Sequence, residues 1–347
     1  MFEKFRTPNF ERLVTTLRGG KADCVPQIEL GVHPAMKSRI LGRTFATLED
    51  DIEFMRVMGY DYVKIQPGFA LEKKRKTGVG VGDPGGSTDV SDRDWAPEGT
   101  GVITSWKEFD EYRWPATSDI DYSRLERAKG LLPEGMGIIG QYGDIFTSVW
   151  EMMGFETFAF ATVDQPDLIS AMFDKVGSLI MSMFDTMADM EWVGALWCSD
   201  DIAYTSGLFL NPDFFRQHLF PLLRRIGDRA RERNIPFLFH SDGKLWEVMD
   251  DLIGCGITAI HPIEPKAMDI RELKSKLGGK IGLCGGIDVD LLARSTPDQI
   301  RELSRTYLRD IAPGGGWCAG SSNSIPDYVT YENYVAMVET VIKEGTY

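Results

Sequence analysis

The chain has 347 residues, of which 43% are hydrophobic and 26% charged, and its formal net charge is −14. This is the composition of a globular protein with room for one large domain or two ordinary ones. The negative charge argues against nucleic-acid binding, which needs a basic surface, and disfavours a highly anionic substrate unless arginines cluster locally. No apolar run approaches the roughly 20 residues that a membrane-spanning helix needs.

The first residues and the cysteines indicate a cytoplasmic protein. The opening Met-Phe-Glu-Lys-Phe-Arg lacks the apolar core and small-residue cleavage site of a secretory signal. The five cysteines are an odd number and are scattered without a Cys-x-x-Cys pair, as expected of reduced thiols.

Apolar segments that end in turn signals alternate with helical periodicity along most of the chain. The expected strands are 24–31, 61–66, 137–142, 194–199, 237–240, 259–263, 280–284 and 316–319. The expected helices are 1–23, 48–58, 121–132, 146–160, 166–190, 212–233, 244–254, 269–277, 296–311 and 331–344. This alternation predicts an α/β fold, a single (β/α)8 TIM-like barrel domain over residues 1–347. No Gly-x-Gly-x-x-Gly follows the first strand, which removes the main argument for a dinucleotide-binding fold.

The segment 69–118 interrupts the alternation after the second expected strand. It is rich in Gly, Asp, Lys and Ser, with short β-like pieces such as 101–104. We interpret it as an insertion, a hairpin that forms a lid over the site.

The chemistry is expected to centre on the end of the strand 237–240. His240 is followed by Ser241, Asp242 and Gly243. Successive side chains along a strand alternate faces, so His240 and Asp242 should point the same way and Ser241 the opposite way. A histidine and a carboxylate on one face suit a metal site or an acid/base pair. The alternative is a strand-end histidine capped by its neighbours.

Other polar residues also lie where strands end, and in barrels of this type the functional groups gather at the C-terminal ends of the strands. They are Glu29, His33, Gln66, Gln141, Tyr142, Asp144, Asp200, Asp201, His261, Glu264, Cys284, Asp288, Cys318 and Asn323. Catalytic zinc typically takes three protein ligands, which His240, Asp242 and Cys318 could provide. Cys284 competes for that role, and for either cysteine the alternative is a small buried hydrophobe.

Several phrases along nearly the whole chain resemble the uroporphyrinogen decarboxylase superfamily. They are Arg-Thr-Pro-Asn-Phe-Glu-Arg-Leu at 6–13, Ala-Asp-Cys-Val-Pro at 22–26, Phe-His-Ser-Asp-Gly at 239–243, Gly-Cys-Gly-Ile-Thr-Ala-Ile-His-Pro at 254–262, Gly-Leu-Cys-Gly-Gly-Ile-Asp at 282–288 and Pro-Gly-Gly-Gly at 313–316. The resemblance implies a distorted (β/α)8 barrel. The superfamily includes haem-pathway decarboxylases and zinc-dependent methyltransferases of corrinoid systems.

The resemblance is nearer to the methyltransferase branch. The decarboxylase branch carries an arginine-rich motif near the N-terminus that grips substrate carboxylates, and the corresponding stretch here, 29–36, has no arginine. The methyltransferase branch places a His-x-Cys pair and a later cysteine on zinc. This chain has His240 and Cys318 but Asp242 where the first cysteine would stand, and aspartate is a competent zinc ligand.

The resemblance therefore implies a zinc-dependent methyltransferase that demethylates a small methoxylated or methylated substrate. The methyl group would pass to a separate corrinoid protein carrying cobalamin, because this chain has no Asp-x-His-x-x-Gly segment. The expected catalytic residues are Asp200, Tyr142 and Glu29, and the expected substrate-binding residues are Gln141, Asp144, Asp201, His33 and His261.

Several alternatives stay open. Asp200 and Asp201 could cap a helix or turn, His33-Pro34 could form a turn, and His261 could be a satisfied core histidine. A metal-free decarboxylase or lyase could use Asp144 or Asp200 as its acid, and a non-catalytic barrel could bind a small ligand. The methyl donor and the oligomeric state, including a homodimer, are left open.

Overall fold

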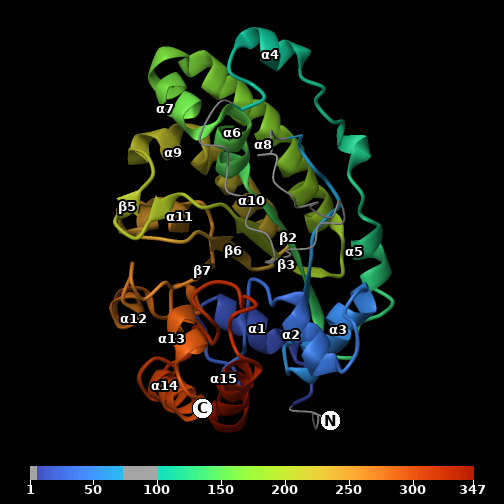
Figure 1. The fold of residues 1–347 in the computed structure, drawn as a ribbon, viewed down its shortest axis with the longest axis vertical. Coiled ribbons are helices and arrows are strands. Elements are labelled where there is room, and N and C mark those ends of the chain that lie inside the picture. Colours follow the sequence, from blue (N-terminus) through green and yellow to red (C-terminus); the bar gives the residue numbers. More distant parts are fainter. Residues whose placement is uncertain (1–5, 73–100) are drawn as a thin grey trace.

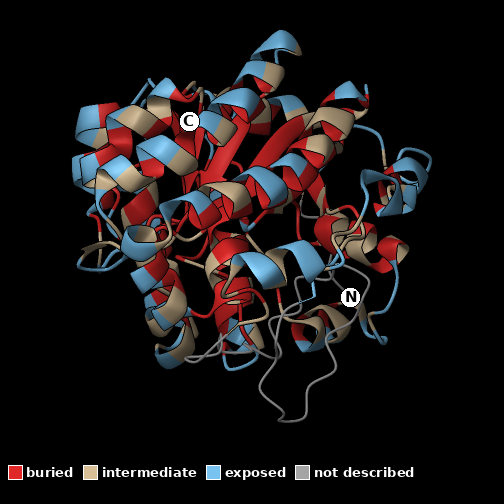
Figure 2. Ribbon diagram, turned by 90° about the horizontal axis from the view of Figure 1, so that it is seen from above, coloured by how far each residue is buried: buried red, intermediate tan, exposed pale blue. Residues whose placement is uncertain are grey.

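The computed structural model describes residues 6–72 and 101–347. Its main sheet has seven parallel strands in the order β1-β2-β3-β6-β7-β8-β9. They are β1 Tyr62–Ile65, β2 Gly137–Gly143, β3 Val193–Ser199, β6 Phe237–His240, β7 Ala259–His261, β8 Gly282–Cys284 and β9 Trp317–Cys318. The sheet curls through the middle of the molecule, and the helices bury their inner faces against it (Figures 1 and 2). The α/β barrel class is confirmed.

The expected strand 24–31 is wrong as a regular strand. The segment makes only isolated bridges among the described residues, Cys24 with Thr346 and Gln27 with Ala319. Proline at position 26 has no N–H to contribute to a ladder, which limits the pairing. The segment still lies beside β9, because Ile28 N donates to Ala319 O at 2.9 Å. Within the described ranges, no backbone–backbone hydrogen bond joins this segment to β1. The barrel is therefore distorted between the segment 24–31 and β1, a place that we call the seam.

Most expected helices are confirmed, with shorter bounds. They are α1 Phe10–Leu17, α3 Leu48–Val57, α5 Ser123–Ala128, α8 Pro166–Asp189, α12 Ile270–Leu277, α14 Pro297–Asp310 and α15 Tyr331–Glu344. The stretch 244–254 retains only a short turn of 3-10 helix and α11, Met249–Gly254. Three elements were not expected from the sequence: α2 Pro34–Leu41, α13 Val289–Arg294 and the hairpin of β4 Ala203–Tyr204 with β5 Gly207–Leu208.

Two expected helices are each broken in two. The stretch 146–160 divides at Gly154, whose φ of +80° suits glycine, into α6 Ile145–Met153 and α7 Phe155–Asp164. The stretch 212–233 divides into α9 Pro212–His218 and α10 Phe220–Glu232. Pro221 stands at the start of α10 and cannot donate the hydrogen bond that a continuous helix needs.

The expected insertion 69–118 falls partly outside the described residues, because 73–100 are not described. The β-like piece 101–104 is not a strand. Gly101 N and Ile103 N donate to the carbonyls of Met153 and Met152 at the end of α6. The segment then forms α4, Trp106–Glu111, and a short 3-10 helix before α5.

Helix α1 covers the N-terminal ends of the strands. Phe10 lies directly against Gly137 and Gly194, where a Cβ atom would come within 2.2 and 2.3 Å of its ring. From the same helix, Arg12 forms an ion pair of 2.7 Å with the buried carboxylate of Asp61, just before β1. This end of the barrel is therefore filled, and the site is expected at the opposite end. Within the described ranges, no helix has both the length and the apolar character needed to cross a membrane.

Candidate functional site

The strand register gathers polar side chains on the inner face of the barrel. Ser199 pairs with His240, and His240 pairs with His261 on the next strand. Further round the sheet, Cys284 pairs with Cys318. Paired residues on neighbouring parallel strands share a face, so the imidazoles form one inward row, with the thiols further round the same sheet. Trp317, next to Cys318, packs on α14 outside the barrel, as this alternation requires.

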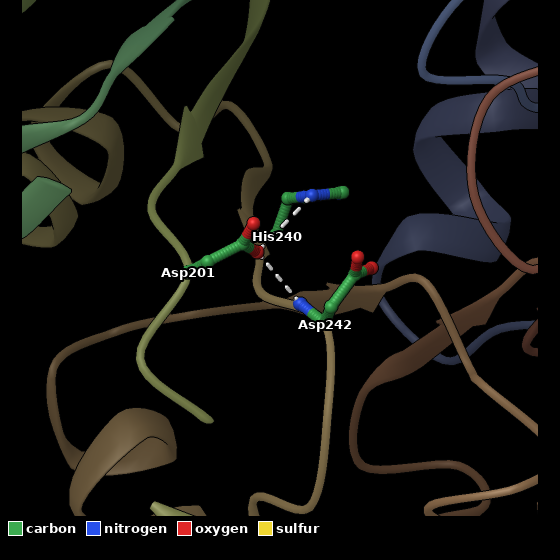
Figure 3. Close-up of side chains that lie close together, drawn as sticks. All are labelled: Asp201, His240 and Asp242. Carbon is green, nitrogen blue, oxygen red and sulfur yellow. Dashed lines mark hydrogen bonds and ion pairs between the residues drawn. The ribbon is translucent and has the colours of Figure 1, made fainter. Parts of the chain in front are cut away.

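Asp201, His240 and Asp242 form a compact cluster at the C-terminal ends of β3 and β6. One potential ligand atom from each lies within 4.8 Å of the others. His240 Nε2 is 3.6 Å from Asp201 Oδ1, and the same oxygen accepts a 2.8 Å hydrogen bond from Asp242 N. Figure 3 shows the Asp201 carboxylate lying between His240 and the backbone of Asp242. The cluster therefore joins two loops from neighbouring strands.

A second histidine fixes the imidazole of His240. The Nδ1 atoms of His240 and His261 are 2.8 Å apart, so one of them must donate to the other. Burial, helped by the nearby Lys64 charge and opposed by Asp201, lowers the pKa of His240 to about 4. Burial also lowers the pKa of His261, well below its usual value. Both rings are therefore neutral near pH 7. When His240 Nδ1 donates, the lone pair of its Nε2 is free to bind a metal beside Asp201.

The local turn follows from the sequence. Ser241 points away from the cluster, and its Oγ accepts a 3.0 Å hydrogen bond from Ile202 N, as the alternation predicts. Gly243 has φ of +89°, and a Cβ atom there would come within 2.6 Å of the Ala203 backbone. Glycine at this position therefore lets the loop after β6 pack against the hairpin after β3.

Cys318 is not among the residues within 4.8 Å of one another in this cluster. It is buried beside Cys284, and burial and that neighbour raise the pKa of its thiol. The segment after β9 instead brings Asn323 to the cluster, where its Nδ2 donates a 2.7 Å hydrogen bond to Asp242 Oδ2. The structure thus gathers Asp201 with His240 and Asp242, and the role of Cys318 as a ligand stays a prediction.

Two of the expected catalytic residues, Asp200 and Glu29, bind backbone groups of neighbouring segments at the C-terminal end of the barrel, which we call the mouth. Asp200 accepts hydrogen bonds from Phe146 N at 2.6 Å and Thr147 N at 3.0 Å, at the start of α6. Glu29 accepts from Ser321 N at 2.9 Å and Ser321 Oγ at 2.5 Å. Burial raises the pKa of each carboxyl to about 8, against the opposing effect of these donors.

The remaining predicted residues lie at or near the same end of the barrel. Gln141 Nε2 donates to Ser199 Oγ at 2.9 Å, which ties β2 to β3 on the inner face. Tyr142 packs edge-on against Phe69, and burial raises its pKa. Asp144 precedes α6 with φ of +60°. His33 caps α2, because its Nδ1 accepts a 3.2 Å hydrogen bond from Ala35 N.

Lys64 is a residue of the inner face that the sequence analysis missed. Its Nζ donates to Leu30 O across the seam of the barrel and lies 5.1 Å from the centre of the Trp197 ring. Burial lowers the pKa of its ammonium group to about 7. The available signal was a lysine in the middle of the apolar strand Tyr-Val-Lys-Ile.

The donor atoms of the cluster suit a divalent metal. Zinc binds imidazole nitrogen and carboxylate oxygen, and three protein ligands leave a position for a further ligand. One neutral imidazole with two carboxylates meets this requirement and is harder than a set containing cysteine. The residues present therefore fit zinc.

A solved structure agrees with the barrel fold over nearly the full length of this chain. Over 96% of this chain and 97% of its own length, a methyltransferase from Methanosarcina mazei superposes with a TM-score of 0.67 at 16% identity. Endo-glycoceramidase II from Rhodococcus sp. gives a TM-score of 0.45 at 14% identity, covering 92% of this chain and 80% of its own. No curated protein sequence matches significantly. The model of the family described as "Uroporphyrinogen decarboxylase (URO-D)" matches residues 93–344, so the chain belongs to the uroporphyrinogen decarboxylase family.

Proposed function

We propose that the protein is a zinc-dependent methyltransferase that takes a methyl group from a small methoxylated or methylated compound and passes it to a separate corrinoid protein. The observation that carries the proposal is the cluster of Asp201, His240 and Asp242 at the C-terminal end of the barrel. Family membership and the full-length fold likeness to the methyltransferase from Methanosarcina mazei support it.

His240 Nε2 and the carboxylates of Asp201 and Asp242 would hold the metal. When bound, zinc supplies Lewis-acid polarisation of the oxygen or other atom that releases the methyl group. His261 keeps the His240 ring in one orientation through their 2.8 Å contact. Asn323 orients Asp242 in the same way through its 2.7 Å hydrogen bond. Such supporting contacts tune metal affinity by about 10- to 100-fold.

Metal content tests the ligand set directly. The purified protein supplied with zinc should retain about one zinc per chain, and His240→Ala, Asp201→Asn and Asp242→Asn should lose it. Asp213→Asn, an exposed carboxylate at the start of α9, is the matched control and should keep it. Cys318→Ser decides the remaining question: retained zinc leaves Asp201 as the third ligand, and lost zinc gives that role to Cys318. A wild-type protein without zinc would contradict the proposal.

Methyl transfer tests the reaction. Zinc-loaded protein, Co(I) cobalamin and a panel of methoxylated and methylated compounds should form methylcobalamin, followed by its absorbance. His240→Ala should abolish the reaction and Asp213→Asn should not. Zinc binding with no methyl transfer from any donor would favour the decarboxylase or ligand-binding alternatives.

A further inference from the structure

Two buried ring nitrogens inside the barrel have no hydrogen-bond partner within the described residues. They are Nε1 of Trp197, a side chain with 0% exposure, and Nε2 of His261, with 1% exposure. An unpaired buried polar group loses its hydrogen bonds to water without replacement, so such groups are rare in native proteins. These atoms therefore need an explanation.

Lys64 brings a positive charge to the same place. Its Nζ lies 5.1 Å from the centre of the Trp197 ring, and the Trp197 and His261 ring centres are 4.8 Å apart. Among the described residues, Leu30 O is the one hydrogen-bond acceptor of this ammonium group, and no carboxylate lies within ion-pair distance of it. We call Lys64, Trp197 and His261, which come from β1, β3 and β7, the donor cluster.

All three side chains of the donor cluster present hydrogen-bond donors, not acceptors, to their surroundings. An indole N–H is a donor only, and an ammonium group has three donors. When His240 Nδ1 donates to His261 Nδ1, the proton of His261 is on its unpartnered Nε2. A buried water could satisfy one such donor, but it does not compensate the charge of the ammonium group. A ligand with anionic oxygen atoms would accept hydrogen bonds from the unpaired donors and would also compensate the charge of the ammonium group.

We propose that the donor cluster is a subsite for the carboxylate of a small-molecule substrate. The inference rests on the proposed function, because the same molecule would direct its methylated group toward the metal ligand His240, which contacts His261. Lys64 keeps partial exposure and lines a cavity together with Leu30 and Lys37. The substrate class is then a methylated or methoxylated monocarboxylate rather than a neutral compound.

Binding of a matched pair of probes to the zinc-loaded full chain tests the charge. Isothermal titration calorimetry would compare 4-methoxybenzoate with the neutral 4-methoxybenzamide, which has nearly the same shape. The acid should bind at least about ten-fold more tightly, as expected for hydrogen bonds to a charged group. Equal affinities, or no saturable binding of the acid, would overturn the proposal.

Variants then assign the effect to the donor cluster. Lys64→Met should weaken binding of the acid by about ten-fold or more and leave that of the amide within about two-fold. Trp197→Phe keeps the ring and removes the N–H, and should weaken the acid less. Lys274→Met and Trp317→Phe are the controls, because these residues donate to the backbone carbonyls of Gly315 and Gly285 away from the cluster. An unchanged affinity in Lys64→Met would overturn the subsite.

The same measurements separate this proposal from the proposed function. Zinc content is determined for every variant, so loss of acid binding with zinc retained reports on the donor cluster alone. Retained zinc and methyl transfer with equal binding of acid and amide would remove the subsite and leave the methyltransferase. A wild-type chain that holds no zinc would remove the proposed function first.

Discussion

The two ends of the barrel differ in how their charged side chains are paired. At the N-terminal end, the carboxylate of Asp61 has 0% exposure and is matched by Arg12 at 2.7 Å, Arg6 at 3.4 Å and Asn9 N at 2.9 Å. At the C-terminal end, Asp201 and Asp242 gather around one neutral histidine, and Lys64 has no carboxylate partner in the described part of the chain. One end thus matches its buried carboxylate with two arginines, whereas at the other end the ammonium group of Lys64 has no carboxylate at ion-pair distance among the described residues.

Burial raises the pKa of Asp61 at the N-terminal end, but the positive charges of Arg6 and Arg12 oppose this rise. The hydrogen bond from Arg12 lowers the pKa of Asp23 to about 2. Burial raises the pKa of Glu29 and Asp200, near the mouth, to about 8. Buried ionisable groups with strongly shifted pKa values are typical of functional sites. The comparison thus favours the C-terminal end as the position of the functional site.

The largest expected effect comes from breaking the compensated end. Arg12→Met leaves Asp61 buried with less compensation and should lower the free energy of unfolding by about 3–5 kcal/mol. Denaturant unfolding monitored by circular dichroism measures it. Asp61→Asn added to Arg12→Met should recover part of the loss, because both charges are then removed.

An exposed ion pair is the control for this prediction. Arg305 pairs with Glu344 between α14 and α15, and both side chains are more than two-fifths exposed. Arg305→Met should change the free energy of unfolding by only about 0–1 kcal/mol. Equal costs at positions 12 and 305 would contradict the picture of a compensated buried network.

A pH dependence is expected at the mouth. The pKa of Glu29 is about 8 in the folded protein against 4.5 for the free side chain. The contribution of protonated Glu29 to the free energy of unfolding is fully present below about pH 4.5 and is lost as the pH rises through 8. The reason is that the unfolded chain releases this proton at a lower pH than the folded protein does. Glu29→Gln does not titrate, so it should gain about 2–4 kcal/mol relative to wild type between pH 5 and 9.

Chemical denaturation across that pH range checks the Glu29 prediction. Glu156→Gln, on the exposed start of α7, is the control and should run parallel to wild type. A constant difference between Glu29→Gln and wild type at every pH would show that Glu29 is ionised at no cost in the folded protein.

The smallest expected effect is a rise in the free energy of unfolding, opposite in sign to the effect of Arg12→Met. Lys64→Met removes an uncompensated cation from the barrel and should raise the free energy of unfolding at pH 7, without ligand, by about 1 kcal/mol. Thermal unfolding of the metal-free protein measures it, with Lys274→Met as the control. A loss of stability in Lys64→Met would mean that its contacts with Leu30 O and Trp197 outweigh the cost of its burial.

The sequence by itself determined the barrel class, seven of its strands and the family, through patterns that depend on near neighbours. Alternation along a strand placed His240 and Asp242 together and turned Ser241 away, because backbone sterics fix those directions locally. The break at Gly154 and the loss of a regular strand at 24–31 also have local causes, a glycine with positive φ and a proline without an N–H.

Only the tertiary structure decided which residues from different strands meet. Asp200 and Asp201 are adjacent in sequence, yet one binds the start of α6 and the other joins His240. The loop after β9 brings Asn323 to Asp242, while Cys318 lies beside Cys284. These outcomes depend on the curvature of the sheet and the path of each loop. Such distances are set by packing across the whole barrel, which no local pattern of residues contains.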